Sequence, residues 1–278
     1  QTLASMRSRH TIALYDYGAT DDGTFFYVME LLDGVDFESL VQKYGAQPPA
    51  RVVHLLIQVC NSLAEAHAAG LVHRDIKPAN LFICRAAEEV DVVKVLDFGL
   101  VRATVEGGER SSMLPAADAP SLLTNPNGMV GTPAFMAPEQ VQGHALDGRA
   151  DLYALGGVAF WLLTGRLVYD QQTALEQMIA QVHAPLPALR SQLPSEVPDA
   201  LVALMESCLA KDPTARPHDA RTLGRTLKAI EFPPDQAWSE DRAQSWWRTR
   251  RPHPSVHPSL DEPRELTIGA PTLSIDRS

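Results

Sequence analysis

The chain has 278 residues, 45% hydrophobic and 21% charged, so it is apolar enough to bury a sizeable core and is not a disordered chain. Its formal net charge of −10 argues against general nucleic-acid binding, and its three widely spaced cysteines suggest neither a disulfide framework nor a metal cluster. No secretory signal is visible, and the longest apolar run, 152–165, suits a buried helix better than a membrane span.

The predicted elements begin with strands and continue with helices. Residues 11–17 and 24–31 are rich in β-forming residues and flank a polar turn, which predicts a hairpin. After Pro48-Pro49, apolar residues recur at helical spacing until Gly70, which predicts one long helix. A second short hairpin is expected over 81–84 and 92–96, and helices are expected over 151–164, 173–182, 199–210 and 220–230. This order predicts an α+β chain with a small β-rich start and a mainly helical body.

The end of the chain has a different composition. Apolar periodicity stops near Ile230, and residues 231–278 are rich in proline and carry mixed charge. We interpret this stretch as a mostly flexible tail. It contains one distinct cluster, Trp246-Trp247-Arg248-Thr249-Arg250-Arg251, whose tryptophans either pack back on the domain or bind a partner. Docking on the chain's own core is the favoured alternative.

Four polar side chains on two short segments have the chemistry of phosphoryl transfer. The segment 73–80 is His-Arg-Asp-Ile-Lys-Pro-Ala-Asn, and Asp-Phe-Gly follows at 97–99. Asp75 is a carboxylate able to take a proton from an attacking hydroxyl, and Lys77 can neutralise charge on a transferred phosphoryl group. Asn80 and Asp97 supply oxygen ligands of the kind that Mg²⁺ prefers. Since phosphoryl transfer depends mostly on positioning and electrostatic stabilisation, the set favours that reaction.

Further motifs follow in order: Ala137-Pro138-Glu139 after a long polar loop over 100–130, then 151–156, then 209–217. Together with the two segments above, they make residues 3–230 resemble the Hanks-type protein kinases, specifically the bacterial serine/threonine branch. The resemblance implies a protein-kinase-like α+β fold with an incomplete β-rich N-lobe and a mainly α-helical C-lobe. It divides the chain into a remnant of the N-lobe and hinge over 1–32, a C-lobe over 33–230 and the tail over 231–278.

The same resemblance implies roles for individual residues in catalysis. Asp75 would be the catalytic base, Lys77 would contact the transferred phosphate, and Asn80 and Asp97 would hold Mg²⁺. Lys77 and Thr132 indicate serine or threonine substrates rather than tyrosine. The implied partners are ATP and protein substrates, with no nucleic acid. A cytoplasmic location is expected, with membrane association only if the parent protein extends beyond this chain.

Other residues would bind the nucleotide or support the loops. Met29 would be the gatekeeper, Glu30, Leu31 and Leu32 would form the hinge whose backbone meets adenine, and Phe82 would lie beneath the adenine ring. The resemblance also implies structural pairs: Asp151 with the backbone of the catalytic loop, Glu139 with Arg216, and His73 with Phe98.

The loop over 100–130 carries the expected regulation. Arg74, next to Asp75, is of a type that often pairs with an activation-loop phosphate in this family, and such a pair can order a mobile loop. The candidate acceptors are Ser111, Ser112, Ser121 and Thr124. Thr124 is preferred because it lies nearest the anchored end of the loop.

Two family features have no counterpart in the sequence. A glycine-rich phosphate loop and the strand with the ATP-binding lysine are absent before residue 11, so the chain is expected to be N-terminally truncated. We therefore predict an active parent kinase and a nearly inactive chain. Two alternatives stay open: a catalytically inactive kinase fragment or pseudokinase scaffold, and a small-molecule phosphotransferase of kinase-like fold. The segment 131–139 resembles the family's protein-substrate platform and argues against the second.

Overall fold

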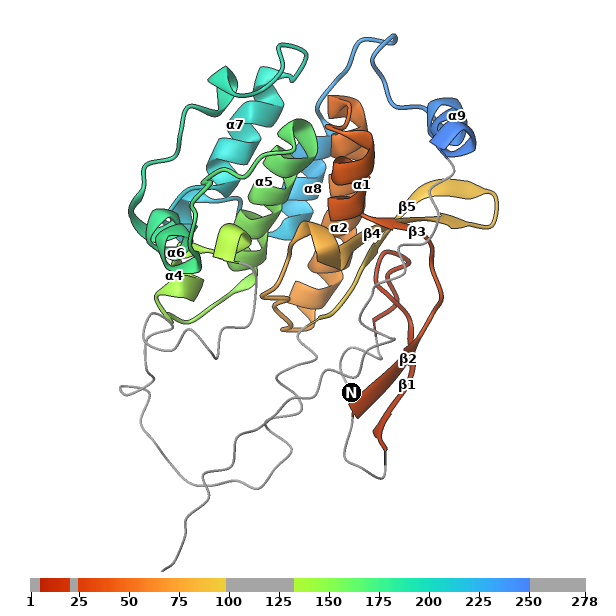
Figure 1. The fold of residues 1–278 in the computed structure, drawn as a ribbon, viewed down its shortest axis with the longest axis horizontal. Helices are drawn as coiled ribbons and strands as arrows, with labels where there is room; N and C mark the ends of the chain where they lie inside the picture. The colour runs from red at the N-terminus through yellow and green to blue at the C-terminus, as the bar shows by residue number, and fades with distance from the viewer. Residues whose placement is uncertain (1–5, 21–24, 99–132, 251–278) are drawn as a thin grey trace, which may run out of the picture.

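The β part of the molecule consists of two small antiparallel sheets. The computed structural model describes residues 6–20, 25–98 and 133–250. In one sheet, β1 (Leu14–Ala19) pairs with β2 (Phe25–Met29), which confirms the first predicted hairpin. In the other, β4 (Leu81–Ala86) lies between β3 (Asp33–Asp36) and β5 (Glu89–Val95), as Figure 1 shows. Of these five strands, only β3 was not predicted.

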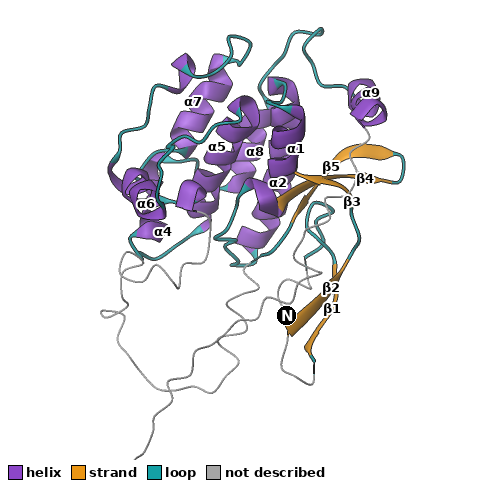
Figure 2. Ribbon diagram, viewed as in Figure 1, coloured by secondary structure: helices purple, strands orange, loops and turns teal. Residues whose placement is uncertain are grey.

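Helices are the dominant secondary structure of the described chain (Figure 2). Its helices are α1 (Phe37–Tyr44), α2 (Pro49–Ala68), α4 (Pro138–Val141), α5 (Gly148–Thr164), α6 (Ala174–His183), α7 (Asp199–Cys208), α8 (Ala220–Lys228) and α9 (Glu240–Arg250). The predicted helices α2, α5, α6, α7 and α8 are confirmed with small shifts at their ends. α1, α4 and α9 were not predicted. The α+β arrangement with a small β-rich start is therefore confirmed.

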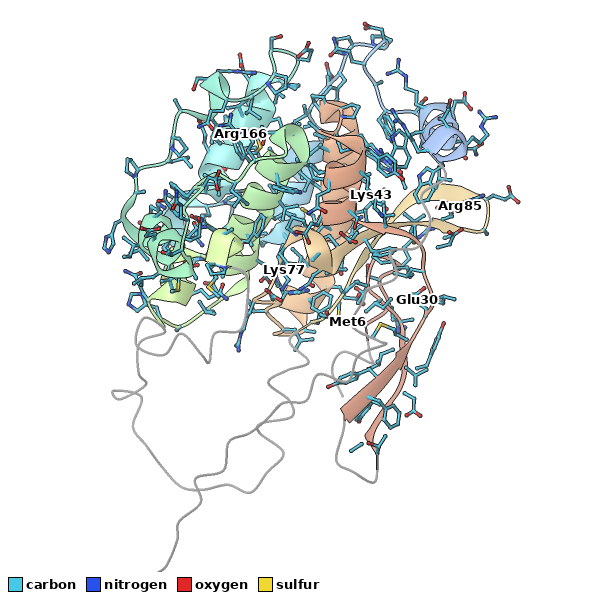
Figure 3. The ribbon with its side chains drawn as sticks, in the orientation of Figure 1. Met6, Glu30, Lys43, Lys77, Arg85 and Arg166 are labelled. Carbon is cyan, nitrogen blue, oxygen red and sulfur yellow. The ribbon has the colours of Figure 1, made fainter. Side chains whose placement is uncertain are left out.

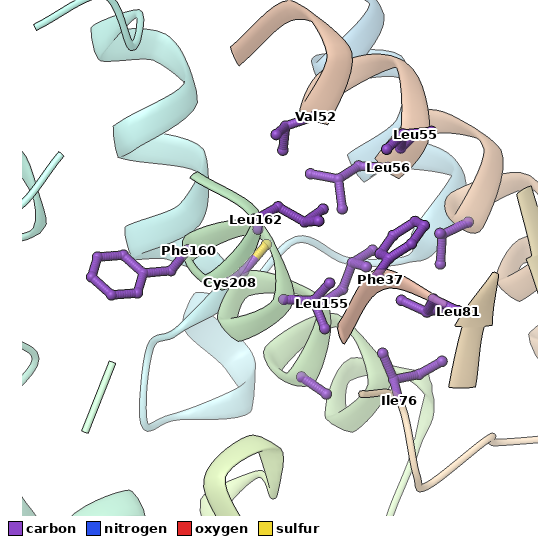
Figure 4. Packing of buried hydrophobic residues seen from close by; sticks show 14 of the residues in the cluster. Phe37, Val52, Leu55, Leu56, Ile76, Leu81, Leu155, Phe160, Leu162 and Cys208 are labelled. Atoms are coloured by element: carbon purple, nitrogen blue, oxygen red, sulfur yellow. The ribbon is translucent and has the colours of Figure 1, made fainter. Parts of the chain in front are cut away.

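Helix α5 forms the centre of the helical body. Its N-cap Asp147 accepts a hydrogen bond from the backbone of Arg149, and Gly165 ends the helix with φ 69°. Almost every side chain between these ends is buried, because α2, α7 and α8 surround the helix. Figure 4 shows Leu155 and Leu162 of α5 among side chains from α1, α2 and β4, including Phe37, Leu56 and Leu81. The core thus joins the helices to the sheet that carries the predicted catalytic segments.

The cysteines do not form disulfides in the structure, as the sequence predicted. Cys60, Cys84 and Cys208 are free and buried. Burial raises the pKa of the Cys84 thiol to about 11 and that of Cys208 to about 12, so both stay protonated and unreactive near neutral pH. No helix in the described ranges is long and apolar enough to cross a bilayer.

The predicted flexible tail differs from the structure over its first half. Residues 240–250 form helix α9, which lies against β5 at the side of the molecule (Figure 1). Trp247 is 4% exposed and Ala243 is also buried. The tryptophans therefore dock on the chain's own core, which was the favoured alternative for this cluster. Residues 251–278 lie outside the described ranges.

Candidate active site

The segment 73–80 connects α2 to β4 and is fixed by one carboxylate from α5. Asp151, 1% exposed, accepts hydrogen bonds from the backbone N–H groups of His73 (2.9 Å) and Arg74 (2.8 Å). These bonds hold Arg74 in a left-handed conformation with φ 67°, which a non-glycine residue adopts rarely. The expected pairing of Asp151 with this loop is confirmed. The sequence did not predict His67, whose Nε2 lies 2.7 Å from Oδ2 of the same carboxylate.

Three of the predicted site residues touch one another. Oδ2 of Asp75 accepts hydrogen bonds from Lys77 Nζ at 2.8 Å and from Asn80 Nδ2 at 3.0 Å. Nδ2 of Asn80 also donates to the backbone carbonyl of Asp75 at 2.8 Å. The side chains of Asp75 and Lys77 are 26% and 22% exposed, so solvent and a ligand can reach both. Figure 3 labels Lys77 at the edge of the helical body. The carboxylate is thus held in a fixed orientation beside a cation.

His73 connects this cluster to the turn that carries Asp97. Its Nδ1 accepts from the backbone N–H of Asp75 at 3.3 Å, so its Nε2 carries the proton and donates to the Leu96 carbonyl at 2.7 Å. The backbone N–H of Leu96 donates in turn to the Asn80 carbonyl at 2.9 Å. The imidazole packs on Phe98 with ring centroids 4.6 Å apart, as expected. His73 therefore has a structural role and links Asp75 to the turn that carries Asp97.

Asn80 and Asp97 have the properties required of Mg²⁺ ligands. Asp97 follows β5 with φ 57° and is exposed, and its carboxylate has no hydrogen-bond or ion-pair partner among the described residues. Asn80 uses its Nδ2 on Asp75, which leaves its Oδ1 as an acceptor. The described residues contain no cluster of three acidic, histidine or cysteine side chains around one point. Two oxygen ligands suit Mg²⁺, because this ion commonly takes its remaining ligands from water and substrate phosphates.

The residues predicted for adenine binding lie where β2 ends and on β4. Leu32 packs against Phe82 in a small cluster with Cys84 and Val92, whereas the Met29 side chain is 40% exposed. Glu30, labelled in Figure 3, accepts from Lys94 Nζ at 2.6 Å and from the Ala13 backbone N–H at 2.8 Å. Lys94 stands opposite Phe82 in the register of β4 and β5. No sequence pattern predicted this ion pair, which connects the predicted hinge to the strand before Asp97.

The segment 133–139 adjoins the catalytic loop. Phe135 and Met136 line a pocket together with Asp75 and Arg74. The volume of this pocket, about 10 Å³, is close to that of a single water site. Gln140 donates to the Arg74 carbonyl at 2.8 Å. Thr132 lies outside the described residues, as do the candidate phosphorylation sites Ser111, Ser112, Ser121 and Thr124.

A buried ion pair anchors the segment 133–139 from its far side. Arg216, whose side chain is fully buried, donates to both oxygens of Glu139 at 2.6 and 2.7 Å. Its other donors reach the carbonyls of Ala210, Lys211 and Arg149. The expected Glu139–Arg216 pair is confirmed. Because its hydrogen-bonding groups have partners, the pair is stable although it is buried away from water.

Comparison with known proteins identifies the family of this chain. Residues 1–226 match the family described as "Protein kinase domain". The chain is 33% identical over 234 residues to the serine/threonine-protein kinase pkn3 of Myxococcus xanthus and 35% identical over 231 residues to PknL of Mycobacterium tuberculosis. Each match covers 83% of this chain, but only 41% and 53% of the respective relative. The chain thus spans about half the length of these relatives or less.

The fold also matches a solved structure. The crystal structure of the Mycobacterium tuberculosis PknI kinase domain aligns with a TM-score of 0.60 and 24% identity. The alignment covers 85% of this chain and 75% of that domain. At this level of identity the likeness concerns the fold alone, and it agrees with a small β part joined to a helical body.

Proposed function

The chain belongs to the protein kinase family, in its bacterial serine/threonine branch, and on that premise we propose that its catalytic cluster transfers the γ-phosphoryl group of ATP to hydroxyl groups of proteins. The observation that carries the proposal is the single carboxylate of Asp75, oriented by both Lys77 and Asn80. Orientation matters because this reaction is accelerated mainly by positioning and by stabilisation of charge.

The proposed reaction uses each residue once. Asp75 accepts the proton of the attacking serine or threonine hydroxyl while the hydroxyl oxygen bonds to the γ-phosphorus. The bond between the γ-phosphorus and the bridging β-phosphate oxygen breaks, which releases ADP. Lys77 lies 2.8 Å from the base and stabilises negative charge on the transferred group. Asn80 and Asp97 would hold Mg²⁺, which would neutralise charge on the phosphates when bound. His73 keeps base and metal-binding turn in register and takes no proton from substrate.

Protein substrates, rather than small molecules, fit the neighbourhood of the base. Phe135 and Met136 share a pocket with Asp75, so a substrate backbone crossing the segment 133–139 would bring its hydroxyl beside the carboxylate. Thr132 would assist in selecting serine and threonine, and phosphorylation at Thr124 would order the loop through Arg74. Met29, Glu30, Leu32 and Phe82 would enclose the adenine ring.

A catalytically inactive scaffold is the second candidate, and one observation favours it for this chain. The β1–β2 hairpin exposes several large side chains, with Tyr15 70%, Tyr17 62% and Val28 45% exposed, and Leu31, two residues after β2, is 98% exposed. Among the described residues this hairpin is a separate sheet of two strands, and such a sheet is marginally stable alone. Nucleotide affinity that depends on this hairpin would therefore be low.

The deciding experiment measures Mg-ATP-dependent phosphorylation of a generic protein substrate by the complete gene product. We expect phosphoserine or phosphothreonine as the products. Asp75→Asn should abolish the signal, whereas Asp33→Asn, an exposed carboxylate near the hinge, should leave it unchanged. No phosphate transfer by the complete product would refute the proposal. Activity retained in Asp75→Asn would refute the assignment of the base.

A further inference from the structure

A buried ion pair lies on the side of the molecule away from the catalytic loop. Arg51 of α2 and Asp91 of β5 have fully buried side chains. The guanidinium donates to both carboxylate oxygens, from Nε at 2.8 Å and from Nη2 at 2.6 Å, and its Nη1 donates to Gln47 Oε1 at 2.7 Å. A charge pair buried this deeply is stable only when its remaining hydrogen-bonding positions are filled.

The C-terminal segment fills those positions with two tryptophans. Trp238 Nε1 donates to Asp91 Oδ2 at 3.0 Å, and Trp247 Nε1 donates to Oδ1 at 2.7 Å. Each carboxylate oxygen therefore accepts one guanidinium and one indole N–H. The guanidinium of Arg51 also lies over the ring of Trp246, 3.9 Å from its centroid, and this indole meets the edge of Tyr44. The contacts are specific, because both indoles must reach the same carboxylate.

Helix α9 depends on these contacts to stay helical and docked. It has 11 residues, of which only Ala243 and Trp247 are buried, and an isolated helix of fewer than about 12 residues is marginal in water. Residues 229–239, which connect it to α8, belong to no helix or strand. Docking therefore rests on a few side chains, the pattern expected of a segment that can detach without global unfolding.

We propose that the surface formed by Tyr44, Arg51 and Asp91 is a docking site for a tryptophan-bearing helix, reversibly occupied by this chain's own residues 238–250, and that occupancy stabilises β5. The coupling runs through Asp91. Its backbone has φ 55°, a strained conformation held by its side-chain contacts and by Gln58, which donates to its carbonyl at 2.8 Å. Asp97 lies six residues after Asp91, just beyond the end of β5. Release of α9 therefore loosens β5, the strand that positions the Asp97 carboxylate. The proposal does not depend on phosphotransfer.

The test is hydrogen exchange in the full chain with the double variant Trp238→Phe and Trp247→Phe. These changes remove both indole N–H donors and keep an aromatic ring at each position. We expect amides of α9 to exchange about tenfold faster or more, with a smaller increase over 92–95 of β5 and no change in α6 and α7. Trp161→Phe is the matched control, because the Trp161 Nε1 has no hydrogen-bond partner among the residues that the structure describes. It should leave α9 and β5 unchanged.

The same variant tests whether the surface accepts a helix from outside. A labelled peptide of residues 231–250, followed by fluorescence anisotropy, should bind the double variant at least about tenfold more tightly than the parent chain, whose own α9 occupies the surface. Unchanged exchange in α9, or equal peptide binding to both proteins, overturns the docking site. Faster α9 exchange with an unaffected β5 overturns the coupling. Protection of α9 that rises with protein concentration would assign the occupant to a second copy and overturn the intramolecular assignment.

Discussion

Replacing Asp151 with asparagine tests how the catalytic loop is held. Oδ1 of Asp151 serves the Arg74 N–H alone, while Oδ2 serves both His73 N–H and His67 Nε2. An asparagine has one acceptor oxygen, so at least one of these donors faces an NH₂ group and loses its partner. An orphaned buried donor costs about 1–3 kcal/mol, and the remaining bonds lose their ionic acceptor, at about 0.5–1.5 kcal/mol in total. We expect the free energy of unfolding to fall by about 2–4 kcal/mol.

Urea unfolding followed by tryptophan fluorescence provides the measurement, with the slope m compared between proteins. The matched control is Asp147→Asn, four residues earlier at the N-cap of the same helix, where asparagine caps as well as aspartate does and the side chain is 56% exposed. The free energy of unfolding of Asp147→Asn should fall by less than about 0.5 kcal/mol. A similarly small loss for Asp151→Asn at unchanged m would show that the carboxylate does not hold the loop.

Two further substitutions probe other contacts of the C-lobe. Lys94→Met leaves Glu30 without its cation, and we expect a loss of about 1–2 kcal/mol in chemical denaturation that Lys94→Arg largely restores; equal stability of all three proteins would contradict this. Asp219 caps α8 by accepting from the Thr222 backbone N–H, which lowers the pKa of Asp219 to about 2. Because the folded pKa lies below the unfolded value, this cap stabilises the fold above about pH 4 and is lost as the pH falls towards 2. Asp219→Ala should therefore cost about 1 kcal/mol at pH 7 and almost nothing near pH 2, and a penalty independent of pH would disprove the ionic cap.

The sequence predicts those parts of the site that are contiguous in the chain. Asp75, Lys77 and Asn80 are five residues apart at most, and their side chains meet directly, as a short rigid loop requires. Asp97 was predicted from its motif, but its connection through His73 and Leu96 involves backbone groups that no residue pattern reveals. The Lys94–Glu30 pair joins residues far apart in sequence, so only the folded chain brings it together.

Two of the elements that were missed, β3 and α9, have a weak local signal. β3 has only four residues, two of them aspartates, and it forms because Gly34 lets its backbone approach Ile83 of β4 closely. α9 is strongly charged and has no regular apolar face, so its composition favoured a flexible tail. It is ordered because the indoles of Trp238, just before the helix, and Trp247, within it, both donate to the carboxylate of Asp91, some 150 residues earlier in the chain. The local periodicity of a sequence does not predict such long-range polar contacts.

Helix α9 also affects how the protein should be shortened for expression. The match to the kinase family ends at residue 226, yet Trp238 and Trp247 cover charged groups in the body of the domain. A version cut at the family boundary would expose Tyr44 and hydrate the Arg51–Asp91 pair, leaving a new aromatic and charged face prone to self-association. A recombinant version should therefore extend at least to residue 250.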